Sequence, residues 1–128
     1  MFWIDPMSRQ PIYEQLIEQA EKFILSGVLA AGAQFPSVRG LSLSLSVNPN
    51  TIQKAYNELE RRGILRTVPG KGSFVAADAV EQLQRQKRDR LTAFDTLVRE
   101  LILAGIAPQE LRERIERLTT EGKENSHD

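Results

Sequence analysis

Cysteine is absent from the 128 residues, and histidine occurs once, as His127 in a polar C-terminal tail. Without cysteine the chain has no disulfide, no thiolate metal ligand and no cysteine nucleophile. A histidine-based metal site or catalytic triad would depend on a single residue near the end of the chain, where side chains are seldom ordered. We therefore expect no metal site and no cofactor.

Long apolar runs are also missing. No apolar stretch approaches the roughly 18 residues needed to span a bilayer. The segment from Met1 to Asp5 lacks the basic and apolar parts of a signal peptide. We expect a cytoplasmic protein with no membrane partner.

The chain has no excess of either charge, since 17 basic residues balance 17 acidic ones. The distribution is uneven, however. Between Ser37 and Val75 six basic residues stand against two acidic ones, a net charge of +4. From Asp78 onwards nine basic residues stand against eleven acidic ones, a net charge of −2. A local basic patch of this kind is what attraction to a phosphate backbone requires.

Hydrophobic periodicity predicts three helices in the first half of the chain. They run from Pro11 to about Leu25, over residues 37–45, and from Asn48 to about residue 62. Ser37 and Asn48 are good N-caps, and Gly63 is a typical stop. The tight turn between the second and third helices is typical of a helix-turn-helix unit.

The third helix has two distinct faces at 100° per residue. One arc is apolar and is predicted to be core: Ile52, Ala55, Tyr56 and Leu59. The opposite arc is amide and cationic: Asn50, Gln53, Lys54, Asn57 and Arg61. Amide side chains can pair with adenine, and lysine with guanine or phosphate. The alternative is an ordinary solvated helix face.

A β-hairpin is predicted directly after this helix. Two short apolar runs, residues 64–68 and 73–76, flank the Pro-Gly turn at residues 69–72. Lys71 at the tip would reach a phosphate or the minor groove. The fold expected is mainly α with a small β-hairpin wing: a winged helix-turn-helix domain over residues 1–77, followed by a two-helix C-terminal dimerisation region.

That C-terminal region, residues 78–128, is predicted to hold one helix over 79–104 and another opening at Pro108, with a polar tail fraying from Thr119. Its apolar stripe exceeds what one short partner helix covers, so we expect a homodimer; the alternative is packing on the N-terminal domain. The expected dimer interface comprises Leu91, Phe94, Leu97, Val98, Leu101, Ile102, Leu111 and Ile115.

Six fragments in order resemble the GntR family of bacterial regulators over about residues 10–76. They are Pro11–Gln15, Pro36–Arg39, Asn50–Thr51, Ala55–Glu60, Gly63 and Gly70–Val75. The short two-helix tail resembles the YtrA-type branch, whose tail serves dimerisation. The resemblance implies DNA contacts by Arg39, by Asn48, Asn50 and Thr51, and by Gly70–Gly72. Many members carry arginine where this chain has Pro49, so that base contact is lost here.

General physical chemistry supports DNA binding by the same surface. A helix N-terminus such as that at Ser37 offers free N–H groups to phosphate, and arginine pairs bidentately with guanine. The complete expected DNA-binding set is Ser37, Arg39, Asn48, Asn50, Thr51, Gln53, Lys54, Asn57, Gly70, Lys71 and Gly72.

The sequence thus predicts a sequence-specific DNA-binding transcriptional regulator, a repressor that binds a two-fold symmetric operator in double-stranded DNA as a homodimer. The alternative is a winged helix that binds protein. We expect no enzyme, because Pro69–Ser73 has neither the upstream glycine nor the Gly-Lys-Ser/Thr order of a phosphate loop. Likewise, Glu14, Glu18 and Glu21 form one solvated helix face. A small-molecule effector stays open: the tail is too small to enclose a typical pocket of about 300 Å³, which leaves sites between subunits or domains.

Overall fold

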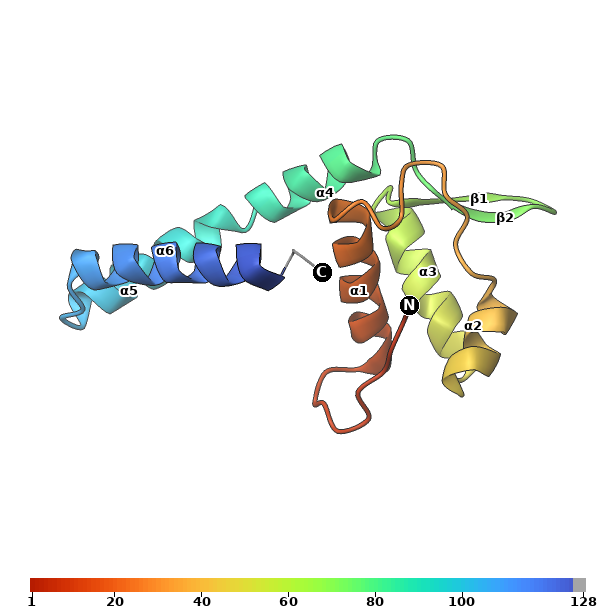
Figure 1. Ribbon diagram of the computed structural model, residues 1–128, viewed down its shortest axis with the longest axis horizontal. Helices are drawn as coiled ribbons and strands as arrows, with labels where there is room; N and C mark the ends of the chain where they lie inside the picture. The colour runs from red at the N-terminus through yellow and green to blue at the C-terminus, as the bar shows by residue number, and fades with distance from the viewer. Residues whose placement is uncertain (126–128) are drawn as a thin grey trace. The chain divides into compact units, whose positions relative to one another are not determined.

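Helices α1 (Ile12–Leu25), α2 (Val38–Leu45) and α3 (Pro49–Arg61) form the core of the first of two units, Met1–Arg85. The computed structural model describes the backbone of residues 1–125 and the side chains of residues 1–122. Figure 1 shows α1 and α3 packed side by side and α2 packed against α3. A β-hairpin follows α3 in the chain. The predicted winged helix-turn-helix is confirmed.

Both predicted N-caps close the first turn of their helices. The Ser37 hydroxyl accepts a hydrogen bond from the Gly40 N–H at 2.9 Å, and Asn48 Oδ1 accepts one from the Asn50 N–H at 2.8 Å. Between the two helices, Ser46 takes a left-handed backbone conformation with φ 55°. The turn and caps therefore fix where α3 begins and in which direction it points.

The apolar arc of α3 is the centre of the core, as its periodicity predicts. Ile52 and Ala55 are fully buried, and Leu59 is 1% exposed. Tyr56 is also buried, and its hydroxyl donates to the Pro36 carbonyl at 2.7 Å. This bond joins α3 to the residue that precedes the α2 cap, so it fixes the start of α2 relative to α3.

Strands β1 (Leu65–Val68) and β2 (Gly72–Val75) form the predicted antiparallel hairpin, with Leu65 opposite Val75. Gln34 adds an isolated bridge to Phe74, and its side-chain amide donates to the Lys71 carbonyl at 3.1 Å. The loop before α2 thereby holds the hairpin near its tip.

The prediction of a single helix over residues 79–104 is wrong. The structure has α4 (Ala79–Arg88) and α5 (Leu91–Leu103), separated at Asp89 and Arg90. At this break the Arg90 N–H donates to the carbonyl of Lys87, three residues back. The helix is interrupted there by a hydrogen bond to the third residue back instead of the fourth. No glycine or proline marks this break in the sequence.

The first unit also extends beyond residue 77, where we expected the domain boundary. Ala79 and Leu83 on α4 belong to the same buried cluster as the core of α1 and α3. Each is only 1% exposed. The first turns of α4 are therefore part of the winged-helix core, and the second unit begins at Gln86.

The second unit contains α5 and α6 (Pro108–Asn125), joined by a short turn at Gly105, after which α6 reverses direction (Figure 1). Fraying of the tail from Thr119 stays a prediction, and the structure describes α6 as helix as far as Asn125. The Thr119 and Thr120 hydroxyls donate to carbonyls four residues back, and Arg117 pairs with Glu121, all of which is compatible with continued helix. His127 lies outside the described residues. None of the described helices is both long and apolar enough to cross a membrane.

Candidate nucleic-acid interface

The outward face of α3 carries three exposed amide side chains. Asn50, Gln53 and Asn57 lie at spacings of three and four residues, so they share one face. Gln53 Nε2 donates to Asn57 Oδ1 at 2.8 Å. These side chains present hydrogen-bond donors and acceptors to solvent close to the start of the helix.

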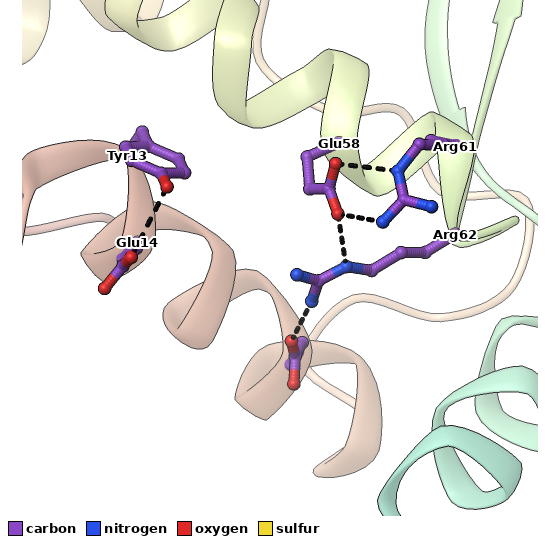
Figure 2. Close-up of polar contacts among 6 residues, drawn as sticks. Tyr13, Glu14, Glu58, Arg61 and Arg62 are labelled. Carbon is purple, nitrogen blue, oxygen red and sulfur yellow. Dashed lines mark hydrogen bonds and ion pairs between the residues drawn. The ribbon is translucent and has the colours of Figure 1, made fainter.

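Lys54 is exposed, but a contact with α1 restricts its side chain. Its Nζ lies 3.9 Å from the centroid of the Tyr13 ring on α1, a cation–π contact. The Tyr13 hydroxyl in turn donates to Glu14 at 3.4 Å (Figure 2). Sequence reasoning missed this role of Tyr13, because only the packing of α1 against α3 brings it close to Lys54.

The far end of α3 is neutralised by an ion-pair network, shown in Figure 2. Glu58 accepts hydrogen bonds from Arg61 at 2.9 and 2.5 Å and from Arg62 at 2.9 Å. These guanidinium groups, Arg61 first, lower the pKa of the Glu58 carboxyl from 4.5 to about 2. The cationic arc predicted for α3 is therefore compensated at Arg61, contrary to expectation, because the carboxylate lies three residues away on the same helix.

Arg62 also reaches α1, where its guanidinium pairs with Glu21 at 3.2 Å. Glu21 is only 6% exposed, so the expectation that it shares a solvated face with Glu14 and Glu18 is wrong. The packing of α1 against α3 covers Glu21, and Arg62 compensates its charge.

A groove of 370 Å³ separates the start of α2 from the hairpin. Ser37, the α2 cap, lies on one wall, and Gly70, Lys71 and Gly72 lie on the other. Lys71 is exposed, as are the two glycines. The structure thus places the predicted phosphate-binding elements of α2 and of the wing around one hollow.

The remaining predicted contacts lie at the starts of α2 and α3. Arg39 is exposed in the first turn of α2 and Asn48 at the cap of α3, whereas Thr51 is half-buried. The first unit therefore carries the helix-turn-helix, its amide face and the wing together. Among the described side chains, no group of three acidic or histidine residues is placed to hold a metal ion.

The predicted dimer residues lie in the second unit, and most of them are uncovered. No side chain of α5 is buried in the single chain. Phe94 is 46% exposed and Leu97 is 52% exposed, while Val98, Leu101 and Leu111 are half-buried. The hydrophobic surface of α5 and α6 is larger than these two helices cover for each other.

Residues 12–75 match the model of the family described as bacterial regulatory proteins, gntR family. The HTH-type transcriptional repressor YtrA of Bacillus subtilis is 38% identical over 132 residues, covering 98% of this chain and 99% of that protein.

Solved structures agree with these sequence relatives. A transcriptional regulator from Oenococcus oeni superposes with a TM-score of 0.72 at 30% identity, covering 91% of this chain and 97% of the other. The DNA-binding domain of AraR in complex with operator ORX1 matches with a TM-score of 0.52 at 31% identity, covering 59% of this chain and 93% of that domain.

Proposed function

This chain belongs to the GntR family of bacterial regulators and is a DNA-binding transcriptional regulator; we propose that it is a repressor that binds a two-fold symmetric operator as a homodimer. The observation that carries the proposal is the surface of the first unit. There the amide face of α3, the capped start of α2 and the tip of the wing lie on one unit. A related domain with this fold is known in complex with its operator.

Each element has a separate task in the proposed complex. α3 enters the major groove, where the amide face of Asn50, Gln53 and Asn57 lies against base edges. The free N–H groups at the start of α2 and the Lys71 ammonium hold phosphates on either side of the groove between them. Arg39 contacts a phosphate or a guanine edge.

Repression is supported by the relative named a repressor and by the small size of the chain, which leaves little surface to recruit polymerase. Dimerisation is supported by the uncovered face of α5, and two copies would read two half-sites about one helical turn apart. Acting on DNA, the protein would work in the cytoplasm.

The test is binding of the purified chain to a labelled fragment of its own promoter across a salt series. We expect tight binding that weakens steeply with salt, because phosphate contacts release counterions. Arg39→Ala should reduce affinity at least tenfold if it makes a bidentate contact. Lys71→Ala should weaken binding to all sequences alike and lower the salt slope by about 1.

Suppose that the wild-type protein binds its promoter no more tightly than random DNA at every salt concentration tested. That result would contradict operator binding in the absence of a ligand. Glu116→Gln, which alters an exposed side chain of α6, is the matched control and should bind as the wild type does.

A further inference from the structure

The Gln53–Asn57 hydrogen bond joins two exposed side chains one helical turn apart on the outward face of α3. The cations of that face are engaged elsewhere, Lys54 by the Tyr13 ring and Arg61 by Glu58. The polar group that remains in the middle of the face is therefore an amide pair, and its chemistry decides what a base would meet.

A glutamine amide has two N–H groups and one carbonyl oxygen. Asn57 Oδ1 accepts one of these N–H groups at 2.8 Å, which leaves the second N–H and Oε1 of Gln53 available. An adjacent donor and acceptor match the N7 acceptor and N6 donor of adenine in the major groove. Guanine presents two acceptors at the same edge and therefore leaves Oε1 without a partner.

The placement within the helix is suitable for reading a base. α3 begins at Pro49, so Gln53 lies in its second turn, where helix-turn-helix proteins contact base edges. The opposite side of this turn holds Ile52 and Tyr56 in the core. Since that side is fixed by packing, the Gln53 side chain is directed away from the protein.

We infer that Gln53 reads an A·T base pair in the operator and that Asn57 is a positioning residue that braces the Gln53 amide. The inference rests on the proposed DNA-binding function. The brace acts before DNA is bound: it restricts the amide to an orientation with its free N–H and Oε1 exposed, which reduces the side-chain entropy lost on binding.

The experiment starts with enrichment of duplexes from a randomised pool by the full-length wild-type chain. Affinities are then measured for duplexes carrying each of the four base pairs at every position of the enriched site. We expect one position at which wild type prefers A·T about tenfold. Gln53→Ala should abolish that preference at that position alone, and Gln53→Glu should shift it to C·G, because a carboxylate accepts from cytosine N4.

The brace is tested by two variants at Asn57. Asn57→Ala should reduce the A·T preference at the same position several-fold. Asn57→Asp, which keeps an acceptor oxygen for Gln53, should retain the preference ratio although its charge weakens binding to every duplex. Lys71→Ala is the control, since losing the phosphate contact proposed for the wing lowers affinity without changing base preference. Thermal unfolding of each variant establishes that the fold is intact.

Three results would overturn the inference in distinguishable ways. Undiminished A·T preference in Gln53→Ala would remove Gln53 as the reader. Full preference in Asn57→Ala would remove the brace. Failure of the wild type to enrich any sequence would reject operator recognition itself, and with it both residue assignments.

Discussion

At the scale of single residues, the charges of this surface are organised by contacts between helices as much as by their number. Lys54 is placed by the Tyr13 ring, and Arg62 by Glu21 on α1. Neither pairing follows from the sequence, because Arg62 and Glu21 are 41 residues apart and only the packing of α1 on α3 brings them together. Periodicity predicted which face of α3 is outward, but not which of its charges are compensated.

Glu58 gives a residue-scale prediction about pH. Its folded pKa of about 2 lies below its ordinary value of 4.5, so the carboxylate stabilises the folded state fully above that ordinary value. This contribution is lost as the pH falls from about 5 to about 2. Glu58→Gln should therefore lower the free energy of unfolding by about 0.5–1 kcal/mol at pH 7, the range of a partly exposed pair, and by progressively less towards pH 2.

Urea unfolding of both proteins at pH 7, 5, 4 and 3 measures this difference, with Glu116→Gln as the matched control on an exposed face. A stability difference between wild type and Glu58→Gln that stays constant across that range would contradict the assignment of the shift to the arginine pairs.

At the scale of elements, the sequence predicts the position of a helix or hairpin correctly wherever it contains a strong capping or turn residue. Ser37, Asn48 and the Pro-Gly turn of the hairpin define their elements through their own hydrogen bonds and backbone preferences, so sequence predicts them. The break between α4 and α5 has no such signal. It falls in a polar stretch after Leu83, the last side chain of α4 buried in the first core.

The cap of α3 carries the element-scale prediction. Asn48→Ala removes the acceptor for the Asn50 N–H and should lower the free energy of unfolding by about 1 kcal/mol. Asn48→Ser restores a capping oxygen and most of that stability. Asn50→Ala, the same chemical change two residues later without a cap bond, should stay within about 0.5 kcal/mol of wild type. Equal losses for Asn48→Ala and Asn50→Ala in thermal or urea unfolding would show that capping is not the cause.

At the scale of the whole molecule, the second unit does not cover its own apolar surface. Its helices were predicted from periodicity, yet periodicity does not say what covers an apolar face. In the single chain α5 buries none of its side chains. Burying Phe94 and its neighbours against a second copy would contribute roughly 25 cal/mol per Å² of apolar area removed from water, and a two-fold axis makes the same patch serve both partners.

Self-association therefore depends on the face of α5 that includes Phe94 and Leu101. Alanine at both positions should raise the dimer dissociation constant at least tenfold, since each truncation removes more than about 1 kcal/mol at a buried interface core. Leu103→Ala is the matched control, because Leu103 is 90% exposed and lies on the opposite side of α5. Sedimentation across nanomolar to micromolar concentrations measures the constants. A double variant that stays dimeric like the wild type throughout this range would place the dimer contact elsewhere, whereas a monomeric variant with weakened operator binding would link this face to recognition of the two half-sites.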